Sequence, residues 1–368
     1  MVPLATFVVV AALGSSWWLT NGAGGLPSSI ATALDALPGV DSVAVASGMP
    51  PTAEVVALAD AAHLSDEGRE IFYATQPELL DAEAFAGRCT DGHAASLFPR
   101  SEVVGCYSGG TGGIVLYAPT DPRLYGFVVE TAAHEALHAA WDRLTGAEQD
   151  ELEPLLEAEV ATVAADDPIL EQIAGSVGEN AENRPTELFA YVGTLLWRDG
   201  GLAPGLEEVY GRFIEDRAAL VAVHTAWQGA LDDMSTEIEA AWAAAAPQET
   251  VNAQERAQLD ADRASVAYYE ESYDAKAAEV AAMSADQRSR LRLAWVWWDG
   301  TDLPMAAAAE TLTSAAGLLS RDAANLSERE AALVAAEAAA TAERARIEAL
   351  VADLKALQDQ LSPTPAAG

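Results

Sequence analysis

The hydrophobic positions of the chain follow two different periods. From residue 51 to residue 246, apolar residues recur every three or four positions, which is typical of amphipathic helices packed around a core. Three residues stand directly before the first such runs and are expected to cap them: Thr52, Ser65 and Asp81. Further helices are predicted over 124–144, 150–165, 185–197 and 206–246.

One segment in this region breaks the helical period. The run from Ile114 to Tyr117 is a short block of strand-favouring residues between a glycine-rich turn and Pro119. This block predicts a β-strand. We expect it to form an edge strand of a small sheet, directly upstream of the helix over 124–144.

Beyond residue 246 the period becomes seven. Apolar residues recur in heptads from Leu259 to Val280 and again from Leu312 to Leu361, with a turn sequence at 299–304 between the two series. This pattern predicts an antiparallel coiled-coil helical hairpin over residues 247–362, followed by a disordered tail at 363–368. Three tryptophans just before the turn could contact a partner or pack on the neighbouring helix: Trp295, Trp297 and Trp298.

The N-terminal segment has a composition of its own. Residues 1–20 are mostly apolar and include Trp17 and Trp18, a pair suited to a bilayer interface. We expect a membrane anchor here, with a cleaved signal peptide and a buried core helix as the alternatives. Residues 21–50 are rich in Gly, Ser, Pro and Ala, which predicts a flexible linker. The folded part is therefore expected at the cell membrane, outside the cytoplasm.

Charge and cysteine content narrow the functional classes. The chain has 57 acidic and 20 basic residues, and its formal net charge of −37 would repel phosphate backbones. Nucleic acid is therefore not expected as a partner. The two cysteines, Cys89 and Cys106, lie in one polar, glycine-bearing stretch, and in an exported chain they are expected to form a disulfide.

The chemistry of the chain is concentrated in the motif formed by His134, Glu135 and His138. Residues i and i+4 of a helix lie on one face, so both imidazoles could bind a single Zn²⁺ ion with Glu135 beside them. Zinc held in this way activates a water molecule, for which the glutamate can act as general base. The motif predicts a zinc metallopeptidase, in which the expected edge strand would align an extended peptide substrate.

Two histidines need a third protein ligand. A metzincin would have glycine at position 141 and histidine at position 144, where this chain has Trp141 and Leu144. A GTxxD motif fails at Trp197. A glutamate from a second helix remains, and we predict Glu187, in the first turn of the helix that Pro185 begins. A helix-capping role of Glu187 is the alternative, and three other glutamates are in reserve: Glu159, Glu179 and Glu182.

A residue that stabilises the oxyanion should lie near the metal. Tyr210 is our candidate, although the sequence does not distinguish it from Tyr191, Arg217 or His224. Two lone histidines are expected to have surface or capping roles: His63 and His93.

The motif resembles that of the gluzincin-like HExxH metallopeptidases, and the order of several segments extends this resemblance. Over about residues 50–228 the chain contains the following segments in order: IFYATQPEL, a cysteine, GCY, a short strand, AHEALHAAWDRL, TELFAYVGT and YGRFIEDR. This order resembles a group of uncharacterised, membrane-anchored bacterial proteins, chiefly actinobacterial. The resemblance implies an extracytoplasmic, zincin-like domain followed by a coiled coil. It also supports Glu187, which occupies the acidic position of TEL.

These predictions describe an α+β, mainly helical protein with a zincin-like metallopeptidase domain over 51–246 and a coiled-coil helical hairpin over 247–362. The expected function is that of a membrane-tethered, extracytoplasmic zinc metallopeptidase with a peptide or protein substrate. The alternative is a non-catalytic cell-envelope scaffold or pseudo-peptidase, which would bind a protein partner or a second copy through its coiled coil.

Overall fold

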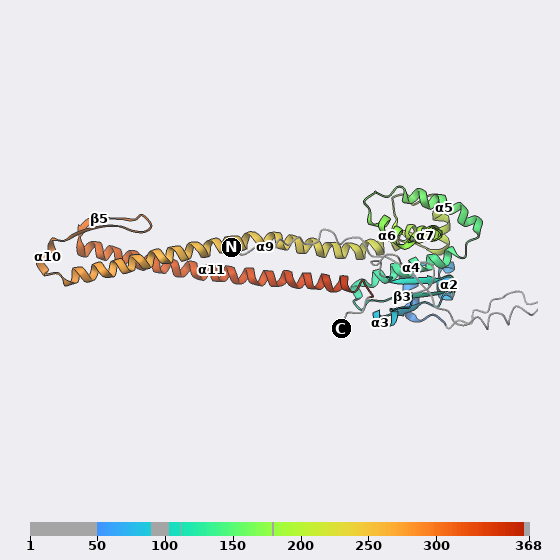
Figure 1. Cartoon of the computed structure of the whole chain (residues 1–368), viewed down its shortest axis with the longest axis horizontal. Helices are drawn as coiled ribbons and strands as arrows, with labels where there is room; N and C mark the ends of the chain where they lie inside the picture. Colours follow the sequence, from blue (N-terminus) through green and yellow to red (C-terminus); the bar gives the residue numbers. More distant parts are fainter. Residues whose placement is uncertain (1–49, 90–102, 111, 179, 364–368) are drawn as a thin grey trace, which may run out of the picture. The chain divides into compact units, whose positions relative to one another are not determined.

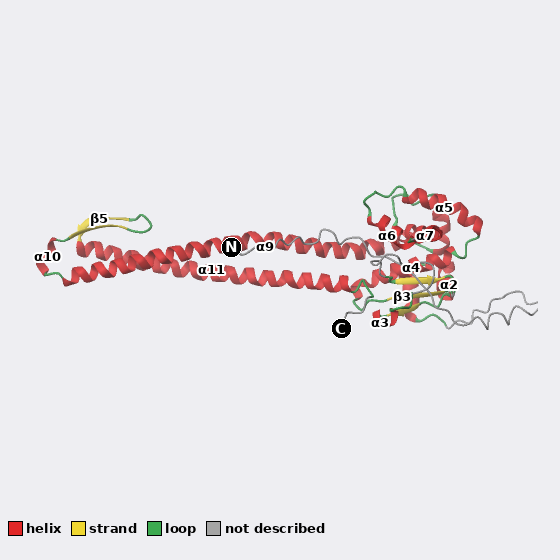
Figure 2. Cartoon of the chain, viewed as in Figure 1, coloured by secondary structure: helices red, strands yellow, loops and turns green. Residues whose placement is uncertain are grey.

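The computed structural model describes residues 50–89, 103–110, 112–178 and 180–363 (Figure 1). It confirms a mainly helical α+β protein with small sheets and a hairpin of two long helices (Figure 2). The chain divides into two compact units: unit 1 comprises residues up to 234 together with 353 onward, and unit 2 comprises 235–352. The predicted anchor and linker lie outside the described residues, as does the tail from residue 364.

Three short helices open unit 1, and side-chain caps fix where they begin. They are α1 (Ala53–Ala61), α2 (Asp66–Ala74) and α3 (Ala82–Phe85). The side chains of Thr52, Ser65 and Asp81 each accept the backbone N–H three residues further on. Such a cap typically stabilises a helix by about 1 kcal/mol. The three predicted caps are therefore confirmed.

A small sheet follows, and it corrects one prediction. Its strands are β1 (Glu78–Leu80), β2 (Gly105–Ser108) and β3 (Gly113–Tyr117), in the order β1-β3-β2. β3 pairs in parallel with β1 and antiparallel with β2. The strand expected at 114–117 is present, but its expected place at the edge is wrong, because β3 has a partner on each side. The backbone of β3 therefore cannot align an extended substrate.

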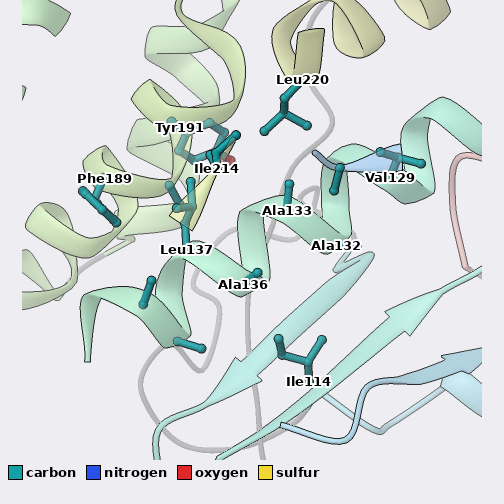
Figure 3. Packing of buried hydrophobic residues seen from close by; sticks show 14 of the residues in the cluster. Ile114, Val129, Ala132, Ala133, Ala136, Leu137, Phe189, Tyr191, Ile214 and Leu220 are labelled. Atoms are coloured by element: carbon teal, nitrogen blue, oxygen red, sulfur yellow. The ribbon is translucent and has the colours of Figure 1, made fainter. Parts of the chain in front are cut away.

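The helix with the HExxH motif, α4 (Tyr125–Trp141), is buried almost throughout its length. This burial arises because β2, β3, α1, α2 and α7 (Arg184–Leu195) all pack against it. Ile114 of β3 points toward Ala136 of the helix (Figure 3). On α7, a Cβ atom at Gly193 would lie 2.5 Å from Leu137 Cδ1 and 2.7 Å from Tyr210 Cε1, so any larger residue would displace both buried side chains.

The remaining elements of unit 1 hold α7 in place. α5 (Gly146–Val160) begins with a capping box formed by Thr145 and Glu148, while α6 (Pro168–Val177) and α8 (Pro204–Phe213) begin with proline. The 3₁₀ turns η2 (Pro122–Leu124) and η3 (Ala181–Asn183) precede α4 and α7. Both α5 and α6 pack on α7, which also contacts α4. The two helices that matter most for the site are thus fixed by several neighbours.

The predicted disulfide between Cys89 and Cys106 is present, and both residues are buried. Cys106 lies in β2, so the bond ties the segment after α3 to a strand that packs against α4. Disulfides persist in oxidising compartments, so the bond indicates that unit 1 folds outside the cytoplasm. Among the described residues, no helix is both long and apolar enough to cross a membrane.

Replacing both cysteines with serine is expected to lower the free energy of unfolding of unit 1 by about 3 kcal/mol. Opening a bond that spans 17 residues of sequence gives the unfolded chain more conformational entropy. Urea unfolding of the full chain, followed by intrinsic fluorescence, measures the change. A thiol reductant added to the wild type should reproduce the loss, and a serine variant of unchanged stability would contradict the prediction.

Unit 2 is built on two long helices, α9 (Arg217–Ala282) and α11 (Ala308–Asp359), of which residues 235–282 and 308–352 belong to it. Heptad residues from both helices are buried: Leu259, Val266, Leu333 and Ile347. Arg256 and Arg329 bind carboxylates of the opposite helix. The predicted helical hairpin is therefore confirmed, although α9 begins at Arg217 and continues through Pro247.

The connection between the long helices is more structured than a turn. It contains α10 (Ala285–Arg290) and a β-hairpin of β4 (Arg292–Val296) and β5 (Asp302–Ala307). The indole N–H groups of Trp297 and Trp298 both donate to Asp322 Oδ2 on α11, at 2.7 and 2.8 Å. Of the two interpretations of the tryptophan cluster, packing on the neighbouring helix holds for these two residues.

Candidate metal centre

His134 and His138 lie one turn apart on α4, and their rings meet. The two Nε2 atoms are 3.1 Å apart, and the ring centroids are separated by 4.8 Å. The i, i+4 spacing of the motif produces this geometry, because both side chains leave the same face of the helix. Two nitrogen atoms therefore converge on one buried point.

Glu187 of α7 brings a carboxylate to the same point. Its Oε2 atom lies 3.7 Å from the Nε2 atom of each histidine. Oε2 is buried and has no hydrogen-bond partner, a state that costs free energy unless a cation or donor joins it. One ligand atom from each of the three residues lies within 4.8 Å of the others. His134, His138 and Glu187 thus form a buried group that could hold a metal ion.

Two contacts orient the histidine rings. His138 Nδ1 is 2.8 Å from Thr186 Oγ1, and this bond leaves its Nε2 facing the carboxylate. The ring of Tyr191 meets that of His134 edge-on, with centroids 4.7 Å apart, and its hydroxyl is 2.8 Å from Ser176 Oγ on α6. Hydrogen bonds to the outer nitrogen of a ligating imidazole fix its tautomer and orientation. The sequence alone did not mark Thr186 or Ser176 for these roles.

Glu135 is buried beside the histidines and is held by the edge strand β2. The backbone N–H of Tyr107 donates to its carboxylate. A Cβ atom at Gly105 would lie 2.6 Å from Thr131 Cγ2 and 3.2 Å from Glu135 Oε1, so a glycine is needed for β2 to approach here. The edge strand β2 therefore donates one backbone N–H group to the carboxylate of Glu135.

Burial sets the protonation of the group. It lowers the pKa of His134 and of His138 to about 4, so both are neutral at pH 7 and can offer lone pairs. Burial also raises the pKa of Glu187, and raises that of Glu135 well above its usual value, with repulsion from Glu187 adding to the effect on Glu135. The contacts between the histidines and Glu187 are therefore not ion pairs at neutral pH.

In a metal-free Glu135→Gln/Glu187→Gln variant, we expect stability to fall as the pH drops from 6.5 toward 4. The unfolded histidines bind protons near pH 6.5, whereas the folded ones resist until about 4, so acid favours the unfolded state. The full effect is roughly 3 kcal/mol per histidine. Thermal unfolding at pH 7 and pH 4 measures it.

The wild type should lose less stability over the same range. The raised pKa values of Glu135 and Glu187 mean that the folded state takes up their protons first as the pH falls, which opposes the histidines. Equal acid losses in the metal-free wild type and in the double variant would contradict the assigned shifts.

The other predicted candidates have different surroundings. The Tyr210 hydroxyl donates to the backbone oxygen of Phe189 at 2.7 Å, and its ring stacks on that of Phe189. Arg217 binds Glu207 and a backbone oxygen. Tyr191 is instead the tyrosine whose ring touches the histidine pair. Of the reserve glutamates, Glu159 pairs with Arg198 and Glu182 is exposed, while Glu179, like His93, lies outside the described residues.

His224 takes part in a buried network one turn before the motif. Glu130 Oε2 accepts hydrogen bonds from His224 Nδ1 at 2.8 Å and from Trp227 Nε1 at 2.7 Å. Both donors lie near the start of α9, within unit 1. The network anchors this part of α9 to α4, and the negative charge of Glu130 partly opposes the lowering of the His134 pKa by burial.

Comparison with known proteins adds no family. No protein-family model, no curated protein and no solved structure matches the chain significantly.

Proposed function

We propose that the chain is a zinc-dependent peptidase that acts outside the cytoplasm. The observation that carries this proposal is the buried carboxylate oxygen of Glu187, unpartnered and 3.7 Å from two neutral imidazole nitrogens. Two imidazoles and one carboxylate are a ligand set of catalytic zinc sites, which keep a further position open for substrate or water. The disulfide is consistent with an extracytoplasmic site of action.

The residues of the chain have distinct roles in this proposal. His134, His138 and Glu187 hold the ion, and Thr186 keeps the His138 ring oriented. When bound, the ion supplies a Lewis acid that polarises the scissile carbonyl and acidifies water. Glu135 accepts a proton at its carboxylate and later delivers it to the leaving amine, a task for which a raised pKa is suited.

Tyr191 is our revised candidate for the group that stabilises the oxyanion. It belongs to the same helix as Glu187, and its ring contacts His134, whereas the hydroxyl of Tyr210 is bound to a backbone oxygen. The Tyr191 hydroxyl bonds to Ser176, so it would need to exchange this partner for the substrate. Tyr191→Phe retains the ring contact and tests the hydroxyl alone.

A pseudo-peptidase that binds zinc without turnover is the second candidate. The observation that favours it is the hydrogen bond from the Tyr107 amide to Glu135, which could hold the carboxylate in a purely structural role. In that case the long hairpin of unit 2 would carry the function of the protein by binding a partner.

Metal analysis and a peptidase assay on the same preparation test both candidates. We expect the purified full chain to contain one zinc ion and to cleave an unfolded protein substrate. A chelator should stop cleavage, and added zinc should restore it. Stoichiometric zinc without cleavage of a broad peptide library would favour the pseudo-peptidase. A chain that retains no metal after purification and reconstitution would refute both candidates.

A further inference from the structure

The three most exposed large hydrophobic side chains of the described residues all belong to unit 2, and two of them lie in the paired strands β4 and β5. Met305 of β5 is 73% exposed, Tyr268 of α9 is 66% exposed and Val296 of β4 is 60% exposed. The ring of Tyr268 is 5.6 Å from that of Tyr269, whose hydroxyl donates to the backbone oxygen of Val296 at 3.1 Å. Singly exposed apolar residues are common on protein surfaces, so a role for these three depends on what surrounds them.

The β4–β5 hairpin has two different faces. In β4, Leu293 and Trp295 are half-buried, while the alternate positions Arg292, Ala294 and Val296 are exposed. Pro304 and Met305 of β5 are exposed as well. We call the exposed apolar residues of the two strands, Ala294, Val296, Pro304 and Met305, the outer face. Two charged residues, Arg292 and Asp302, are exposed at its two ends, and Asp302 pairs with Val296. Side chains that point to water from a strand are usually polar, so four apolar residues between these ends are unusual.

Hydrogen bonds attach the β4–β5 hairpin and the tryptophans after β4 to α11, so the outer face is already formed in the unbound chain. Trp297 and Trp298 share the acceptor Asp322 of α11, and Trp297 is fully buried. Thr311 Oγ1 of α11 donates to the backbone oxygen of Leu293 at 3.1 Å. These contacts turn the inner face toward the long helices. A preorganised surface loses little conformational entropy when it binds.

Positive charge gathers where the chain enters the hairpin. Arg288, Arg290 and Arg292 are exposed, and the segment from Ser284 to Arg292 contains a single acidic residue, Asp286. Asp286 pairs with Arg290 at 2.7 Å, whereas Arg288 and Arg292 donate to backbone oxygens. Because the chain as a whole has a net charge of −37, this cationic segment is a local exception. Its charge acts over about 8 Å at physiological salt.

The size of the outer face decides between a protein and a lipid partner. Two strands of five and six residues present a face roughly 18 Å long and 10 Å wide. This apolar face is on the order of 200 Å², whereas each partner in a stable protein interface contributes roughly 800 Å², more than half of it apolar. A lipid surface needs no such area, because each apolar side chain that enters it contributes separately.

We propose that the outer face of the β4–β5 hairpin binds an anionic lipid surface. Val296 and Met305 enter the boundary between headgroups and acyl chains, and Tyr268 lies at the level of the headgroups. Arg288, Arg290 and Arg292 bind lipid phosphates, for which the planar guanidinium is well suited. Asp302, exposed at the turn, is at the opposite end of β4 from the arginines. The proposal does not depend on the metal centre.

A fluorescent probe on the outer face tests the proposal in the full chain. The two cysteines of the sequence are joined in the disulfide, so a single new cysteine can be labelled selectively. Met305→Cys with an environment-sensitive fluorophore is expected to shift to shorter wavelength with phosphatidylcholine vesicles that contain phosphatidylglycerol. Quenching by spin-labelled lipid should accompany the shift. Val334→Cys, an exposed site on α11, is the matched control and should not respond.

The arginines are tested in the Met305→Cys background. Each Arg→Gln change at 288, 290 and 292 is expected to weaken vesicle binding about fivefold, so the triple variant should bind on the order of 100-fold more weakly.

Four outcomes would contradict the proposal. Equal fluorescence shifts at positions 305 and 334 would mean that the N-terminal segment merely brings the chain to the vesicle. An equal fluorescence shift with vesicles of pure phosphatidylcholine would show that the arginines do not contribute to binding. A fluorescence shift that grows with protein concentration in the absence of vesicles would identify a second copy of the chain as the partner. Each of these results, like an unchanged position 305 probe, overturns the proposal.

Discussion

Glu187→Gln is expected to lower zinc affinity on the order of a thousandfold, because the amide keeps the size of the side chain but removes the anionic ligand. The metal-free variant should be at least as stable as the metal-free wild type. The reason is that the substitution removes a buried carboxylate whose Oε2 atom has no partner. Chelator competition gives the affinity, and thermal unfolding of the metal-free proteins gives the stability.

This pair of measurements separates a metal ligand from a helix cap. A capping glutamate would leave the metal in place, and its loss would cost about 1 kcal/mol of stability. Glu182→Gln is the matched control, since Glu182 is an exposed glutamate in the 3₁₀ turn just before α7. It should change neither quantity. If Glu187→Gln retained wild-type affinity, another residue would have to supply the third ligand.

The parts of the fold that the sequence predicted are those that local spacing determines. The caps at Thr52 and Ser65 act within one helical turn, and the two histidines share a face because they are four residues apart. Glu187 could be proposed because Pro185 favours a helix start, and it does lie in the first turn of α7. The heptads that predicted the hairpin are likewise a local repeat, carried by residues such as Leu259 and Leu333.

The predictions that differ from the structure concern pairing between segments that are distant in the sequence. The sequence predicts β3 at an edge because β1 has only three residues and β2 only four, too few to be recognised as its two neighbours. The helix expected over 206–246 is in fact α8 and α9, because the chain leaves the helical path at Ile214 to form a bridge with Leu64. No local pattern reveals such pairing.

The surroundings of the candidate metal group were equally hidden from the sequence. The bond between Thr186 and His138 joins residues 48 positions apart, and the contact between Tyr107 and Glu135 joins a strand to a helix. Tyr210 and Tyr191 could not be separated by sequence, since both are tyrosines in helical patterns downstream of the motif. Only the folded structure shows that the hydroxyl of Tyr210 binds Phe189, while the ring of Tyr191 touches His134.

Glu135→Gln is expected to reduce peptide hydrolysis by a factor of roughly 10² to 10⁴ while leaving zinc bound, because the amide cannot accept a proton. The amide oxygen can still accept the hydrogen bond from the Tyr107 backbone, so β2 should remain packed on α4. Metal content and hydrolysis of the same peptide are measured on both proteins at one pH. Zinc content equal to that of the wild type serves as the internal control.

The state of Glu135 explains why this substitution separates the two candidate functions. Burial and the nearby Glu187 raise the pKa of Glu135, whereas a cation held by Glu187 and the two histidines would favour the ionised form. Glu135 would then be ionised at neutral pH and could accept a proton. If hydrolysis by the variant equalled that of the wild type, Glu135 would have only the structural role that its bond to Tyr107 permits.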